Sequence, residues 1–130
     1  MIVVDASAVV DALVQEPPNV ALRERVDGGG LQAPHLIDIE VTNALRRLVA
    51  RGALSADRAA DTRDDFAALN IMRYPHRPLL DRVWELRDRL TPYDAAYVAL
   101  AELIGAPLVT CDARLARARG HAAVVEIYRP

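Results

Sequence analysis

Lysine is absent from the sequence, and all 16 basic residues are arginine. This absence excludes several kinds of site, because a Walker A phosphate loop, a Schiff-base enzyme and a Ser–Lys hydrolase each need a lysine. A phospho-receiver domain, which also places acids at strand ends, usually relies on a lysine too. The net charge of −2 gives no overall attraction to nucleic acid. A polyanionic partner would therefore have to be held by local arginines or by bound cations.

Cysteine and long apolar runs are also scarce. Cys111 is the only cysteine and cannot form an intramolecular disulfide, which fits a reducing cytoplasm. Acids interrupt the apolar stretches well before the length that a bilayer requires, so we expect no membrane association. The first residues, MIVVDAS, lack the basic segment of a signal peptide. These features predict a cytoplasmic protein.

The chain has the length and apolar content of a single domain, residues 1–130, with a continuous core. Hydrophobic periodicity predicts short strands at residues 2–4, 31–33, 71–74, 108–110 and 124–127. Between them it predicts helices at residues 7–15, 34–51, 55–69, 77–90, 92–104 and 113–119, and a short helix that ends at residue 27. This alternation predicts an α/β fold with a mostly parallel sheet and helices on both faces.

Two acids lie just past the carboxyl ends of expected strands. Open parallel sheets bind ligands at the carboxyl ends of their strands, where the strand order reverses. Asp5 and Asp112 occupy such positions and can therefore meet at one edge of the sheet. Each also has an alternative role as a helix N-cap, for which Asp is well suited. Ser7 could cap the first helix instead of Asp5.

Two further acids lie near the beginnings of helices. Thr91-Pro92-Tyr93-Asp94 fits a capping box, yet the helix that follows is apolar nearly all round, as in a helix covered on several sides. Asp94 is therefore expected to face a cleft. Glu40 lies at the margin of an apolar helical stripe and could either face the site or be a solvated surface residue.

Four carboxylates within roughly 5–6 Å of one another would repel by about 3 kcal/mol per pair at an effective dielectric of about 20. Such a cluster needs raised pKa values or hard divalent cations such as Mg²⁺ or Mn²⁺.

The segments MIVVDASAVV, IEVTNALRR, TPYDAAYVALAE and LVTCDARL together resemble the PIN domain and, within it, the VapC toxins of bacterial toxin–antitoxin pairs. They span nearly the whole chain in the family's order. The acids Asp5, Glu40, Asp94 and Asp112 fall on the family's four acidic positions. The last two segments are the more specific.

This resemblance implies an α/β/α sandwich and a Mg²⁺- or Mn²⁺-dependent endoribonuclease toxin that hydrolyses RNA. It implies Asp5, Asp94 and Asp112 as metal ligands, with Glu40 as a ligand or as the group that activates the attacking water. It also implies a cognate antitoxin protein and a homodimer. Ser7 and Thr110 match small hydroxyl positions that support the acids.

Two other functions remain open on the residues. A metal-dependent phosphatase with strand-end aspartates usually carries D-x-D-x-T after its first strand, and Asp5-Ala6-Ser7 lacks the second acid. A non-catalytic, partner-binding PIN module is the other alternative. Two arginine clusters could hold phosphates: Arg46, Arg47 and Arg51, or Arg114, Arg117 and Arg119. The alternative for both clusters is a solvated helix face.

Overall fold

The computed structural model describes residues 1–129. At its centre lies a sheet of 5 strands in the order β3-β2-β1-β4-β5, and neighbouring strands pair in parallel. The strands are β1 (Ile2–Val4), β2 (Leu31–Pro34), β3 (Ile71–Tyr74), β4 (Leu108–Thr110) and β5 (Val125–Ile127). The mostly parallel sheet expected from the sequence is confirmed.

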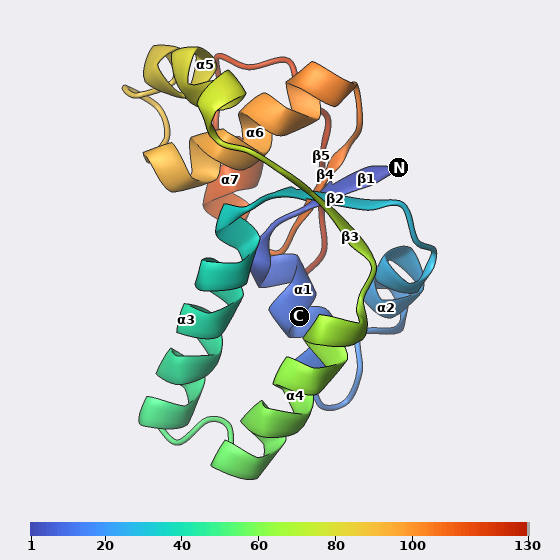
Figure 1. The fold of residues 1–130 in the computed structure, drawn as a ribbon. Coiled ribbons are helices and arrows are strands. Elements are labelled where there is room, and N and C mark those ends of the chain that lie inside the picture. The colour runs from blue at the N-terminus through green and yellow to red at the C-terminus, as the bar shows by residue number, and fades with distance from the viewer. Residues whose placement is uncertain (130) are drawn as a thin grey trace.

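Helices cover both faces of this sheet (Figure 1). One side carries α1 (Ala6–Val14), α2 (Val20–Asp27), α3 (Leu36–Ala50) and α4 (Ala56–Ala68). The other side carries the short 3₁₀ turn η1 (Arg77–Leu79), α5 (Leu80–Glu85), α6 (Pro92–Ile104) and α7 (Ala113–Arg117). The chain runs outward from β1 through β2 to β3 and then returns to β4 and β5. Because parallel crossovers are right-handed, the reversal puts the two groups of helices on opposite faces. The three-layer α/β/α sandwich is confirmed.

The central strands are the most deeply buried part of the fold. In β1, Ile2 is 1% exposed and its two valines are fully buried, and the residues of β4 are also fully buried. Strands buried on both faces need apolar side chains in succession rather than in alternation, which is why Ile2-Val3-Val4 carries no polar position. At the edge of the sheet this requirement lapses, and Met72 of β3 is 59% exposed.

Helix α6 confirms the expectation that it is covered on several sides. All of residues 95–101 are buried, and the helix packs against β1, β2, β4 and α5. Thr91 caps its beginning by accepting a hydrogen bond from the Asp94 backbone N–H. Gly105 ends it with φ 65°, a left-handed conformation that glycine adopts without steric cost. The fold thus holds the middle of α6 against the central strands of the sheet and leaves Asp94 at the beginning of that buried stretch.

Several expected helix boundaries are wrong, and the helix expected over residues 113–119 ends at Arg117. The helix expected from residue 34 begins at Leu36, because the His35 N–H still bonds to the Tyr74 carbonyl and prolongs the pairing of β2 with β3. The helix expected over residues 77–90 is a 3₁₀ turn followed by α5, which ends at Glu85. Beyond α5 the Arg89 N–H bonds to the Leu86 carbonyl, three residues back, so the chain tightens into turns.

Within the described residues, no helix combines the length and the apolar character that a bilayer crossing needs.

Candidate active site

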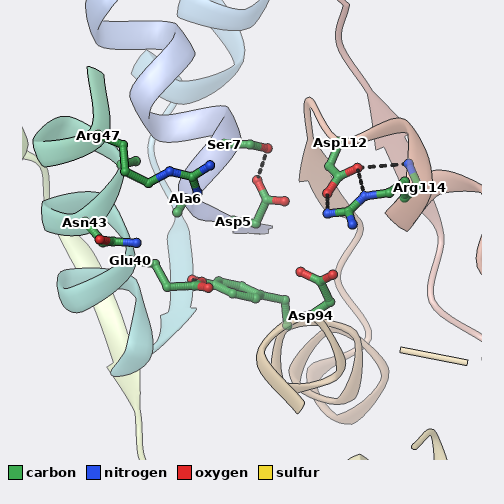
Figure 2. Close-up of a pocket in the computed structure, with 11 residues that line it drawn as sticks. Asp5, Ala6, Ser7, Glu40, Asn43, Arg47, Asp94, Asp112 and Arg114 are labelled. Carbon is green, nitrogen blue, oxygen red and sulfur yellow. Dashed lines mark hydrogen bonds and ion pairs between the residues drawn. The ribbon is translucent and has the colours of Figure 1, made fainter. Parts of the chain in front are cut away.

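One hollow of about 270 Å³ is lined by the four acids singled out from the sequence. Asp5 directly follows β1, and Asp112 comes two residues after β4. Glu40 lies in the second turn of α3 and Asp94 in the first turn of α6. Strands β1 and β4 are neighbours whose connections lie on opposite faces, so the hollow is at the switch point of the sheet. Figure 2 shows the four side chains around this hollow, each from a different element.

Asp5 is the most buried of the four acids, at 6% exposure. Its carboxylate accepts hydrogen bonds from the Ser7 hydroxyl (2.7 Å), the Ala8 backbone N–H (3.0 Å) and the Thr110 hydroxyl. Burial raises the pKa of Asp5 to about 6, although these three hydrogen bonds oppose the shift; the charge of Asp94 adds to it. Asp5 is therefore both the N-cap of α1 and a buried acid of the hollow.

The two hydroxyls that hold Asp5 also tie β4 to α1. The Ser7 Oγ accepts a 2.9 Å hydrogen bond from the Cys111 N–H, and the Thr110 Oγ1 accepts a 3.0 Å bond from the Asp112 N–H. The segment that leads to Asp112 is thus positioned by the same residues that position Asp5. Burial raises the pKa of the Cys111 thiol to about 12, and the charge of Asp11 adds to the shift, so it stays a thiol at neutral pH.

Asp94 differs from Asp5 because no hydrogen bond to its carboxylate occurs within residues 1–129. The capping box is half formed: Thr91 accepts from the Asp94 N–H at 3.3 Å, but the carboxylate does not bond back. Burial raises the pKa of Asp94, and repulsion from Asp112 raises it further, while the charge of Arg114 lowers it. Capping therefore does not account for the Asp94 carboxylate, which faces the hollow (Figure 2).

Glu40 is held by a residue that the sequence analysis did not single out. The Tyr97 hydroxyl donates a 2.7 Å hydrogen bond to Glu40 Oε1. Burial raises the pKa of Glu40, the bond from Tyr97 opposes this shift, and Asp94 adds to it. Tyr97 follows Asp94 by three residues and so shares its helix face, and it is the one polar-tipped side chain among the buried residues of α6. That combination is the sequence signal that could have identified it.

Asp112 is paired with a cation of the chain itself. It caps α7 by accepting from the Arg114 N–H at 2.9 Å, and its other oxygen lies 3.1 Å from Arg114 Nη2. Burial works to raise the pKa of Asp112, but the hydrogen bonds and the charge of Arg114 bring it below the ordinary value. Arg114 also lines the hollow, as do Asn43, Ala44 and Arg47 of α3.

The donor set fits a hard divalent cation. All four acids offer oxygen. Burial raises the pKa values of Asp5, Glu40 and Asp94, and repulsion from a neighbouring acid adds to each shift, so a bound cation would favour their charged forms. Across residues 1–129, no group of at least 3 Asp, Glu, His or Cys side chains is arranged to hold one ion. Mg²⁺ usually keeps several waters and binds through one or two carboxylates, so this spacing is compatible with it.

The match to the PIN domain family extends over residues 2–121, and the chain belongs to that family. It is 41% identical over 127 residues to ribonuclease VapC12 of Mycobacterium tuberculosis, which covers 98% of both chains. It is 43% identical over 129 residues to ribonuclease VapC1 of the same species, covering 98% of this chain and 97% of the relative. The crystal structure of PAE2754 from Pyrobaculum aerophilum matches with a TM-score of 0.68 and 27% identity, over 95% of this chain and 81% of that one. The resemblance to the VapC group is confirmed.

Proposed function

We propose that this protein is an endoribonuclease that acts as the toxin of a toxin–antitoxin pair and depends on Mg²⁺ or Mn²⁺. The observation that carries the proposal is the set of four carboxylates lining one hollow, in a chain whose curated relatives are ribonucleases. Hydrolysis of an RNA phosphodiester needs an activated water and a neutralised phosphate. In a hollow with this many acids, bound cations would neutralise the phosphate and also offset the charge of the carboxylates.

Each acid has a role in this proposal. Asp5, Asp94 and Asp112 bind Mg²⁺ or Mn²⁺ directly or through the waters that the ion keeps, and Glu40 is either a further ligand or the group that takes a proton from the attacking water. Bound Mg²⁺ would stabilise charge on the phosphate and lower the pKa of the attacking water. Because the pKa of Glu40 is raised toward the working pH, its carboxylate is better suited to accept a proton than an ordinary surface acid.

The supports of the acids explain how such a site stays organised. Ser7 and Thr110 fix the Asp5 carboxylate through hydrogen bonds from α1 and β4. Tyr97 orients Glu40 across the hollow from α6. Positioning of this kind is effective in catalysis because the reacting groups need not reorganise when charge develops. The rigid elements of the fold therefore support the same chemistry as the acids.

A pair of substrates separates this function from its alternatives. The purified chain should cleave a circular single-stranded RNA, which has no ends for an exonuclease to attack, and should leave p-nitrophenyl phosphate intact. A metal-dependent phosphatase would release p-nitrophenol and leave the circle closed. A non-catalytic module would act on neither substrate. Glu40→Gln serves as the matched variant, because it keeps the size of the side chain and removes its charge.

The proposed partners are a cognate antitoxin and a second copy of the chain. We propose that the antitoxin binds on α3 and α4, between Leu36 and Leu69, where Ile39 is 70% exposed. Co-expression with the product of the adjacent short reading frame should give a complex, and light scattering of the chain alone should give the mass of a dimer. A lone monomer that forms no complex would contradict both assignments.

A further inference from the structure

A second hollow, of about 200 Å³, adjoins the acids. It lies between α1 and α3 and shares part of its lining with the first hollow, namely Ser7, Ala44 and Arg47. From there it continues toward the end of α3, where Leu48 and Arg51 line it. The two hollows together form a groove that leads from the acids along α3; it is called the α1–α3 groove below.

Two arginines border the α1–α3 groove on its α3 side. Arg47 and Arg51 are one helical turn apart, so they lie on the same face, and about 6 Å separates them along the axis at 1.5 Å per residue. Both are exposed. The ion pairs of residues 1–129 engage Arg25, Arg58, Arg73, Arg82 and Arg114, and neither of these two. Figure 2 shows the Arg47 side chain extending from α3 toward the beginning of α1.

The other arginines considered from the sequence are placed differently. Arg46 is hydrogen-bonded to Asn43 through Nε (3.2 Å) and Nη2 (3.0 Å) and lines neither hollow. Arg114 faces the acids but is engaged by Asp112. Arg117 and Arg119 line neither hollow. Position in the fold thus separates Arg47 and Arg51 from neighbours with the same charge.

We infer that the α1–α3 groove holds the backbone of single-stranded RNA as it leaves the acids. Arg47 binds the phosphate next to the scissile one, and Arg51 binds the following phosphate. The separation of the two arginines along α3 suits successive phosphates of an extended strand. The Asp11 carboxylate lines the α1 wall and repels phosphate, which keeps the backbone on the α3 side. This inference rests on the proposed function, because it takes the acids as the place of cleavage.

Salt dependence of binding measures these contacts directly. Each phosphate neutralised by an arginine contributes about 0.7 to the slope of log K against log salt for a single strand. The parent for the measurement is Asp94→Asn, which should leave RNA uncut, with a fluorescent single-stranded RNA as the probe. Adding Arg47→Ala or Arg51→Ala should lower the slope by about 0.7 each, and the pair should lower it by about 1.4. Arg46→Ala is the matched control and should leave the slope unchanged.

Replacing one charged phosphate of the RNA by an uncharged methylphosphonate shows which phosphate each arginine contacts. A methylphosphonate one step from the scissile linkage should weaken RNA binding by the parent but not by the Arg47→Ala variant. One step further, it should weaken the parent but not the Arg51→Ala variant. Equal losses in every variant, a slope change for Arg46→Ala as large as for Arg47→Ala, or no RNA binding by the parent would overturn the inference. Melting temperatures of all variants check that each is folded.

Failure of this inference is distinguishable from failure of the proposed function. If the wild-type chain cleaves RNA while Arg47→Ala and Arg51→Ala leave the slope unchanged, the RNA-binding role of the groove is wrong and the proposed nuclease function is retained. If the slope changes as expected while the wild-type chain cleaves no RNA, the groove binds RNA and the nuclease is wrong.

Discussion

The Tyr97 hydroxyl donates a 2.7 Å hydrogen bond to Glu40 and thereby joins α6 to α3 across the hollow of acids. The ring of Tyr97 is 1% exposed, so this bond is made by a side chain that packing already fixes. A buried hydroxyl that points at a half-buried carboxylate both orients it and favours its charged form. The relationship therefore couples the core of the sandwich to the proposed chemistry.

Tyr97→Phe tests this coupling, because it removes the hydroxyl and keeps the ring. Without the hydrogen bond the pKa of Glu40 should rise further, since burial and Asp94 both raise it already. The pH at which RNA cleavage falls on the acid side should therefore move upward relative to wild type, with a loss of stability of roughly 1 kcal/mol. Rates of RNA cleavage between pH 5 and pH 9 give the profile. A lower rate with an unmoved profile would mean that Tyr97 acts on shape alone.

The buried Asp5 carboxylate makes the stability of the metal-free chain dependent on pH. Its pKa is about 6 in the folded chain against an ordinary value of 3.8, so the folded state binds the proton more tightly. Stability is then greatest below about pH 4 and is lost as the pH rises through about 6. Asp5→Asn keeps the helix-capping oxygen and removes the charge. In chelator the variant should match wild type near pH 4 and exceed it at pH 8, by at most about 3 kcal/mol at 1.36 kcal/mol per pKa unit.

Urea unfolding at the two pH values measures this difference. Asp57→Asn is the control, because Asp57 is exposed in the first turn of α4 and does not line the hollow. An Asp5→Asn chain that is less stable than wild type at pH 8 would mean that the carboxylate stabilises the fold, and the account of its pKa would be wrong.

Asp94→Asn distinguishes two possible roles of Asp94, namely stabilising the beginning of α6 and binding a cation. If the charge of Asp94 served mainly to stabilise the helix terminus, its removal would cost roughly 0.3–1 kcal/mol. Because Asp112 repels Asp94 and no hydrogen bond to its carboxylate occurs in the described residues, we expect the opposite. In EDTA the melting temperature should be unchanged or raised, and the increase that Mg²⁺ causes in wild type should disappear. A destabilised variant that still responds to Mg²⁺ would remove Asp94 from the site.

We expect Arg114 to compete with a bound cation for Asp112. Its guanidinium lies 3.1 Å from the Asp112 carboxylate, and its charge also lowers the pKa of Asp94. Arg114→Ala should therefore leave these acids with a greater shortage of positive charge, and Mg²⁺ should raise the melting temperature more than it does in wild type. Arg117→Ala, on the same short helix but outside the hollow, should respond as wild type does. Equal responses of all three chains would contradict the competition.

The sequence was sufficient to predict the three layers and the convergence of the acids on one hollow, because both depend on local patterns. The short buried strands Ile2-Val3-Val4 and Leu108-Val109-Thr110 end just before Asp5 and Asp112, and the position of ligand sites at the carboxyl ends of parallel strands then brings the two acids to one edge of the sheet. The apolar surroundings of Asp94 marked it in the same way. These inferences needed only periodicity and strand direction.

Other features depend on packing between distant segments and could not be read from the chain. The bond from Tyr97 to Glu40 joins residues 57 apart in sequence. Arg46 and Arg47 are identical and adjacent, and only the position of α1 against α3 decides which of them lines the groove. The helix expected over residues 77–90 shortens because the chain must turn to reach the beginning of α6. In each case the deciding partner lies on another element.

Metal dependence of RNA cleavage tests the central claim most directly. Wild-type protein treated with EDTA is returned to buffers with Mg²⁺, Mn²⁺ or Ca²⁺ and incubated with single-stranded RNA, beside Asp94→Asn in the same buffers. We predict no cleavage in EDTA, full cleavage by wild type with Mg²⁺ or Mn²⁺ but not Ca²⁺, and a loss of orders of magnitude in the variant. Full cleavage in EDTA, or full activity of Asp94→Asn with Mg²⁺, would contradict the account.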